Sequence, residues 1–140
     1  KGDLVYKDES GFSFSYSKGI KVTDITPESD EYYSRLKLAK GNEFLTISVK
    51  DAKTSGYEDS SLVGAVSLAG MPAKQYAKGE KLATVAVDSG VVYLIEGLKD
   101  GGYWEDVQNT VALSFTLAEK TSSSGSAVDN AIYEEEEVIE

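Results

Sequence analysis

The residues Ser15 to Lys18 read S-Y-S-K and match the S-x-x-K spacing of serine acyl enzymes. That chemistry needs the serine at the start of a helix, so that the lysine lies beside it one turn further on. Residues 12–17 instead alternate aromatic and serine side chains, which predicts a strand, and Lys18-Gly19 predicts a turn after it. Because the serine and lysine would not meet in that geometry, the motif does not predict acyl transfer.

The chain contains neither histidine nor cysteine. This excludes a thiol nucleophile, a disulfide framework, a zinc finger and every Ser-His-Asp or Cys-His arrangement. Histidine is also the usual acid–base group near neutral pH. We therefore expect a protein that is not an enzyme and that binds no cofactor and no metal. The enzyme class that stays open is a carboxylate-dependent hydrolase, which would need two acids converging in a pocket.

Negative charge is concentrated at the C-terminus. The net charge is −10, and residues 121–140 contain no base but hold the acids Asp129, Glu134, Glu135, Glu136, Glu137 and Glu140. Calcium loops need spaced oxygen ligands, and the run Glu134–Glu137 lacks that spacing. We see no basic stripe in the sequence that would overcome the negative charge, and we therefore expect no nucleic-acid binding.

Two interpretations of this C-terminal segment stay open. Residues 121–130 have the composition of a linker, and an acidic run is typical of a solvated, self-repelling tail. If the segment docks instead, Ile132, Tyr133, Val138 and Ile139 would be its apolar contacts. Addition of this segment as a strand to an open sheet edge, within the chain or in a neighbour, is one way to achieve that.

The nine tyrosines and one tryptophan suggest a surface that stacks on a carbohydrate or contacts a partner. The aromatics near predicted turns are Tyr32, Tyr33, Tyr57, Tyr103 and Trp104. Trp104 also fits a purely structural role, in which it anchors a helix to a sheet. Tyr57 lies in a polar stretch with no periodic apolar partner, and we expect it to be exposed and to contact a ligand or partner.

Strand patterns dominate the rest of the chain. Period-two alternation places Leu36 and Leu38 on one face of an early hairpin, whose second arm runs through residues 43–52. Residues 53–64 are predicted to form a loop, residues 65–69 a strand, and the chain is expected to be extended again up to Tyr76. The segments 80–87 and 91–98 predict a hairpin around Asp88-Ser89-Gly90, and both arms are apolar enough to be covered on both faces.

The rhythm changes after Gly101-Gly102. Apolar residues from Tyr103 to Val111 recur at helical spacing, which predicts a short helix. Residues 111–117 then alternate and predict a last strand. The fold class is therefore α+β, with a mainly antiparallel sheet of about six or seven strands flanked by one or two short helices. We expect one domain over residues 1–120 and a Ser/Gly linker with an acidic tail over residues 121–140.

The order of these segments resembles the PsbP-like family. The resemblance is carried by GFSFSYSKGIKV (11–22), LAGMPAKQY (68–76), VVYLIEGL (91–98) and NTVALSFTL (109–117). Family members commonly open with a Y-P-x-x-W pattern, of which Tyr16 is present here, with Ser17 and Ile20 at the proline and tryptophan positions. Ser114 and Phe115 match the closing S-F of the family. The resemblance implies an antiparallel sheet flanked by helices.

The resemblance also implies a cellular role, because many bacterial members are exported proteins or lipoproteins. The chain opens on Lys1 rather than Met, which fits a removed leader, and a leader or lipid anchor would be the route of membrane tethering. We therefore expect an extracytoplasmic or cell-surface domain that recognises a protein or a surface ligand. The alternative is a structural or assembly subunit that uses residues 121–140 as a linker or donated strand.

Overall fold

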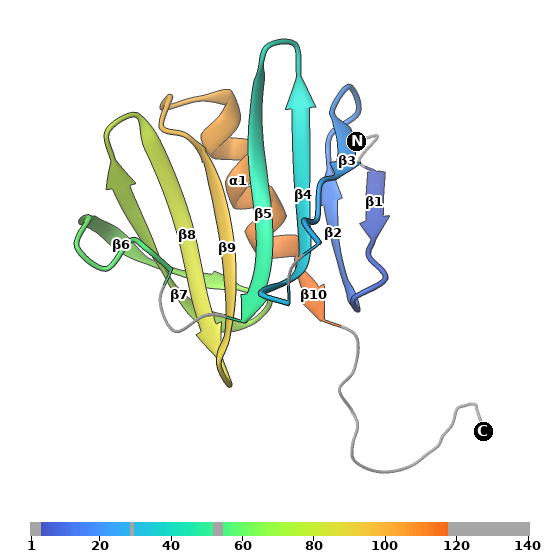
Figure 1. The fold of residues 1–140 in the computed structure, drawn as a ribbon. Helices are drawn as coiled ribbons and strands as arrows, with labels where there is room; N and C mark the ends of the chain where they lie inside the picture. The colour runs from blue at the N-terminus through green and yellow to red at the C-terminus, as the bar shows by residue number, and fades with distance from the viewer. Residues whose placement is uncertain (1–3, 29, 52–54, 118–140) are drawn as a thin grey trace.

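The computed structural model describes residues 4–28, 30–51 and 55–117 of the 140-residue chain. Ten strands and one helix lie in this part, arranged as two antiparallel sheets and a helix that packs on the larger sheet (Figure 1). The elements are β1 (Leu4–Lys7), β2 (Phe12–Tyr16), β3 (Lys21–Asp24), β4 (Tyr32–Lys40), β5 (Glu43–Asp51), β6 (Ser61–Leu68), β7 (Met71–Lys78), β8 (Lys81–Asp88), β9 (Val91–Leu98), α1 (Tyr103–Ser114) and β10 (Thr116–Leu117).

The main sheet has seven strands in the order β3-β4-β5-β9-β8-β7-β6. Two-residue turns join β4 to β5, β6 to β7, β7 to β8 and β8 to β9, whereas a longer connection joins β3 to β4. The one long-range junction pairs β5 with β9, with Ile47 opposite Ile95. The predicted turn between β8 and β9 is confirmed, because Ser89 and Gly90 both adopt positive φ angles of 55° and 81°. A two-residue turn with both residues in the left-handed conformation has a backbone twist that matches the twist of the two strands it connects.

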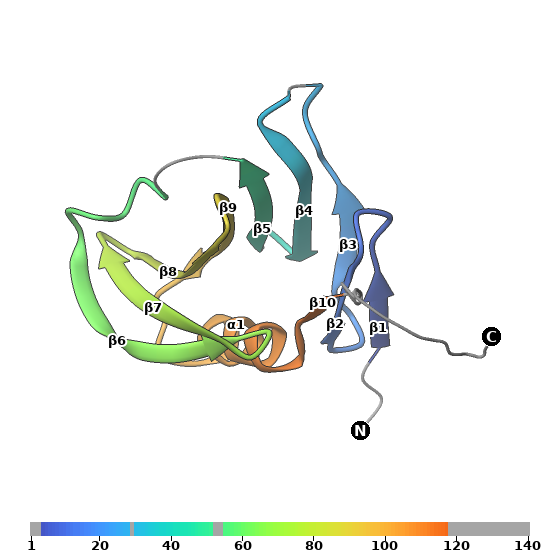
Figure 2. The same cartoon turned by 90° about the horizontal axis from the view of Figure 1, so that it is seen from below.

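Alternation along the strands creates the core. Leu36 and Leu38 of β4, and Leu45 and Ile47 of β5, are buried on the face of the main sheet that packs against α1. Trp104 and Val111 point from α1 into the same core. In Figure 2, α1 lies together with β2 and β10 on one side of strands β4, β5 and β9. The helix therefore covers one face of the main sheet.

The small sheet, β1-β2-β10, closes the core beside the helix. Phe12 and Phe14 of β2 are buried, as the alternation predicted, whereas Tyr16 is half-buried. Phe115, which follows α1 directly, stacks on Phe12 with ring centroids 4.9 Å apart. The aromatic face of residues 12–17 is thus a wall of the core.

Gln108 joins the middle of α1 to the main sheet. It is fully buried, donates to the carbonyl of Leu82 at 3.1 Å, and accepts from the Thr84 hydroxyl at 2.6 Å. Gly97 of β9 makes room for this contact, since a Cβ there would lie 3.1 Å from Gln108 Nε2 and 3.1 Å from Leu45 Cβ. A side chain at position 97 would displace one of these neighbours.

The α+β class and the antiparallel sheet are confirmed, but three local predictions are wrong. The helix continues to Ser114, so Leu113 faces solvent at 77% exposure and strand structure is limited to Thr116–Leu117. The predicted loop 53–64 ends early, because β6 begins at Ser61 and turns into β7 through Ala69-Gly70. Strand β1 was not predicted. Short apolar segments fit the periodicity of both a helix and a strand, and the residues that pack against them determine which of the two forms.

Candidate functional site

The outer face is the side of the main sheet that points away from α1. Its composition follows from strand alternation, because every residue next to a helix-facing one points outward. Burial of Leu36 and Leu38 against α1 turns Arg35 and Lys37 outward. The hydrogen bond from Gln75 to Asn109 of α1 similarly turns Lys74 outward.

The outer face is basic although the chain as a whole is acidic. Strands β4, β5, β9, β8 and β7 lie side by side and present these outward bases: Arg35, Lys37, Lys50, Lys74, Lys78 and Lys81. Glu96 is the one acidic residue at an outward position of these five strands. The expectation that the chain has no basic stripe is therefore wrong, since the bases come together only when the strands pair.

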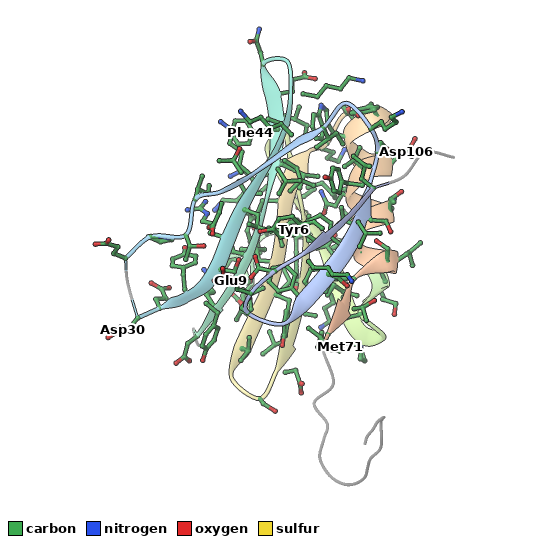
Figure 3. All side chains as sticks on the ribbon, turned by 90° about the vertical axis from the view of Figure 1, so that its right-hand side faces the viewer. Tyr6, Glu9, Asp30, Phe44, Met71 and Asp106 are labelled. Carbon is green, nitrogen blue, oxygen red and sulfur yellow. The ribbon has the colours of Figure 1, made fainter. Side chains whose placement is uncertain are left out.

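A groove of about 390 Å³ lies on this face across β4, β5, β9 and β8. Its lining residues are Arg35, Asn42, Glu43, Phe44, Thr46, Lys81, Glu96, Gly97 and Leu98. Figure 3 shows Phe44 on the side of the sheet opposite the helix that carries Asp106. Phe44 is 45% exposed, so the groove offers an apolar ring next to fixed cations.

Glu96 is held at the centre of the outer face by three partners. Tyr57 donates its hydroxyl proton to Glu96 Oε2, and the Thr46 hydroxyl lies 3.5 Å from Oε1. Lys81 Nζ lies 3.9 Å from Oε2. These contacts offset the negative charge of Glu96 and position Lys81 at the edge of the groove.

Aromatic rings hold several of the cations over the sheet. Lys37 Nζ lies 4.7 Å from the centre of the Phe44 ring, and Lys50 Nζ lies 5.8 Å from that of Tyr32. The Arg35 guanidinium lies 5.7 Å from the same Tyr32 ring, and its Nε is buried with no partner among the described residues. Cation–π contacts of this kind leave a cation able to meet an anion on its other side.

The prediction that Tyr57 is exposed is wrong. Tyr57 is 4% exposed and packs with Ala83, Val85, Val92 and Leu94 in a second small core on the outer side of the sheet. Its burial, together with the hydrogen bond to Glu96 and the charge of Glu96, raises the pKa of its hydroxyl. The tyrosine lies in a polar loop without apolar periodicity, and the sheet residues that cover it come from distant strands.

Trp104 is the anchor between helix and sheet, the structural role that the sequence left open. It is 2% exposed, and its indole N–H donates to Glu43 at 3.0 Å. Tyr103 is 40% exposed, with Lys40 Nζ 4.8 Å from its ring centre. The structure therefore keeps Tyr103 as a surface aromatic but places it outside the basic groove. Ile132 and Tyr133, the other predicted contacts, lie outside the described residues.

The described residues set further limits on the chemistry of the site. No three acidic side chains among them converge closely enough to hold a metal ion. The two acids at the groove are Glu43 and Glu96, and both accept hydrogen bonds from buried aromatic side chains. Helix α1 is too short and too polar to cross a membrane, and the described residues contain no other helix.

Comparisons with known proteins place the fold. No family model matches the sequence, and no curated protein is significantly similar to it. The solution structure of cyanobacterial PsbP (CyanoP) from Synechocystis sp. PCC 6803 superimposes with a TM-score of 0.53 and 18% identity, over 83% of this chain and 92% of that chain. The fold is PsbP-like. At this identity the likeness concerns the PsbP-like fold alone, and it agrees with the sequence resemblance on the antiparallel sheet and its helix.

Proposed function

We propose that this protein is a non-catalytic, extracytoplasmic binding domain whose outer face binds an acidic surface of a protein partner. The observation that carries the proposal is the gathering of Arg35, Lys37, Lys74, Lys78 and Lys81 on one sheet face, around the loop that packs Tyr57 on β8 and β9. Glu96 is the one acid at an outward position of these strands, and Glu58 of the loop lies near Lys74. Complementary charge on two surfaces favours their encounter and fixes their orientation.

The acidic net charge does not prevent such binding. Exposed charges farther apart than roughly 8–10 Å are largely screened at physiological salt. A partner that reaches the outer face therefore senses the local bases more strongly than distant acids. A protein fits this face better than a nucleic acid, because Phe44 and Leu98 add apolar contacts to the groove, while a long polyanion would also meet the acidic surroundings.

Extracytoplasmic placement, as an exported or lipid-anchored domain, rests on the resemblance to PsbP-like bacterial proteins. It is tested on the gene, where a signal peptide or lipobox is expected upstream of Lys1. Fractionation of the producing cells provides the matching protein measurement.

Photo-crosslinking in those cells tests the binding face. A photoreactive amino acid at position 44 lies at the groove, and one at position 113 on α1 is the control, because Leu113 is more exposed than Phe44 and lies on the other side of the molecule. We expect one adduct of defined mass from position 44 and none from position 113. The Lys37→Glu/Lys74→Glu variant should lose the adduct, whereas Lys7→Glu/Lys18→Glu, with the same net charge, should keep it. Equal adducts from both positions, or from both charge variants, would contradict the proposal.

A structural or assembly role is the second candidate, and the open edges of both sheets favour it. β6 ends the main sheet with Leu62 and Val63 more than half exposed, and β1 ends the small sheet with Val5 60% exposed. Such edges accept an added strand. Residues 121–140 would supply it, and the measurement is size and thermal stability with and without them. If the deletion changes neither, the donated strand is refuted.

A further inference from the structure

We propose that the outer face takes an extended acidic peptide, and that the chain's own residues 129–140 are the first such segment it binds. This inference rests on the proposed function, because it uses the same face. It adds the identity of an occupant, and it makes binding of any outside partner a competition with the C-terminus.

Charge complementarity is the first argument. The outer face carries bases on β4 and β5 and on β8 and β7, on both sides of the loop that packs Tyr57 on the sheet. The five strands from β4 to β7 span roughly 19 Å at the usual spacing between strands. Residues 129–140 carry Asp129, the run Glu134–Glu137 and Glu140, with no base among them. In the described chain, no other run of four acids competes for these bases.

Apolar complementarity is the second argument. The acidic run is flanked by Ile132-Tyr133 on one side and Val138-Ile139 on the other. The outer face exposes Phe44 at 45% and Val87 at 55%, at opposite ends of the paired strands. When the glutamates of residues 134–137 lie over the lysines of the outer face, one of the two flanking apolar pairs can therefore contact Phe44 or Val87.

The length of the connection is sufficient. The described chain ends at Leu117 in β10, on the α1 side of the main sheet (Figure 2). The segment between Leu117 and Glu134 reaches roughly 20–25 Å as a flexible chain and roughly 55 Å when extended. A domain of this size has a radius of gyration of roughly 13 Å, so the acidic run can pass the sheet edge and reach the outer face.

Tethering makes a weak contact effective. A short flexible linker gives an effective concentration of about 1 mM. If the free segment binds with a Kd of about 0.1 mM, the tethered one occupies the face about nine-tenths of the time and weakens a competitor about tenfold.

A labelled peptide with the sequence of residues 128–140 is the probe, and fluorescence anisotropy is the readout. The natural chain is compared with a full-length chain in which Glu134–Glu137 are all changed to Gln. We expect the neutralised chain to bind the peptide about tenfold more tightly, because its own segment no longer competes. Binding should weaken steeply with added salt. Equal affinity of the two chains would overturn the proposal.

Two charge variants, made on the neutralised chain, locate the binding surface. Lys37→Glu/Lys74→Glu should lower peptide affinity at least tenfold, whereas Lys7→Glu/Lys18→Glu should change it less than twofold. The control lysines are exposed and belong to the small sheet and its following turn. If both variants lost the same peptide affinity, the net charge of the chain alone would determine binding, and the assignment of the binding site to the outer face would be overturned.

The outcomes also separate this inference from the proposed function. If both chains bind the peptide equally and the outer-face variant abolishes binding, the inference fails while an acidic outside partner stands. If neither chain binds the peptide, both this inference and the proposed function are refuted. Sedimentation at low and high protein concentration tests whether the outer face instead binds residues 129–140 of a second copy of the chain. In that case, dimers would become more abundant at higher concentration and would be absent from the neutralised chain. This result would overturn binding within one chain.

Discussion

At the scale of single residues, the hydrogen bond from the Tyr57 hydroxyl to Glu96 stabilises the outer face. Tyr57 is buried and bonds a carboxylate that also faces Lys81. A buried hydroxyl bonded to a charged acceptor contributes about 1.5–3 kcal/mol when the acceptor would otherwise lose its partner. The pair therefore supports both the small outer core and the position of Lys81 at the groove.

Tyr57→Phe should lower the free energy of unfolding by about 1–3 kcal/mol, because Glu96 loses a buried donor. Urea unfolding at pH 7 measures this. Tyr103→Phe, which removes the hydroxyl of a 40% exposed tyrosine, is the matched control and should change little. Equal stability of the Tyr57 variant and the natural chain would contradict the role given to this bond.

The same residue predicts a pH dependence. Burial and the Glu96 contact raise the Tyr57 pKa above its ordinary value of 10.0, so the folded state holds this proton more tightly than the unfolded state does. The resulting stability is present below pH 10 and is lost as the pH rises through the raised pKa. Tyr6, whose pKa burial and Asp8 raise to about 12, adds to the same loss. Between pH 10 and 12 the natural chain should therefore lose stability more steeply than Tyr57→Phe.

At the scale of elements, α1 determines which face of the sheet stays open. Its first turn is held by Asp100, whose carboxylate accepts from the backbone N–H groups of Trp104 at 2.9 Å and Gly102 at 2.9 Å. These bonds satisfy donors that a helix start leaves unpaired. Because Trp104 is the anchor of the helix, the cap also orients α1 against the main sheet.

Asp100→Ala should lower the thermal midpoint at pH 7. The backbone bonds from Trp104 and Gly102 hold the Asp100 pKa below its ordinary value of 3.8, so the stability they add is present above that pH and is lost as the pH falls through the lowered pKa. The difference from the natural chain should therefore shrink at the acidic end of a thermal series. Asp106→Ala, exposed one turn into the helix, is the comparison. A difference that persists unchanged at low pH would mean that the carboxylate charge is not the cause.

At the scale of the whole molecule, one aromatic cluster joins the two sheets. Phe115 stacks on Phe12 at 4.9 Å and on Phe14 at 6.2 Å, and meets Tyr93 of the main sheet edge-on at 6.3 Å. The small sheet, the end of α1 and β9 thus share one packed core. A shared core predicts that both sheets unfold together.

Phe115→Ala should cost about 3–5 kcal/mol, the usual range for a buried phenylalanine. Urea unfolding followed by Trp104 fluorescence and by circular dichroism should give coincident transitions in both the natural chain and the variant. Leu113→Ala, two positions earlier and 77% exposed, should change stability by less than about 0.5 kcal/mol. Separate transitions for the two signals would show that the sheets fold independently.

The fold was largely predictable, whereas the site was not. Alternation in residues 36–38 identified a buried strand correctly, because burial of one strand face imposes a period of two on the sequence. The nearly continuous apolar arms 80–87 and 91–98 identified a central hairpin, because strands covered on both faces need apolar residues at successive positions. Tyr57 was misplaced because its core partners, such as Val92 and Leu94, come from a distant strand. Residues 111–117 were misplaced because Val111 and Phe115 suit either period, and contact with β2 and β9 decides the outcome.

The sequence by itself determined which side chains share a face of each strand, since alternation is a local property of extended backbone. Arg35 must oppose Leu36, and Lys74 must oppose Gln75, whatever the rest of the chain does. Only the tertiary structure decided that β5 lies beside β9 and that α1 covers the apolar side. That pairing joins segments far apart in the chain, and it depends on packing of the whole core. The basic outer face exists because lysines dispersed along the sequence are aligned by this pairing.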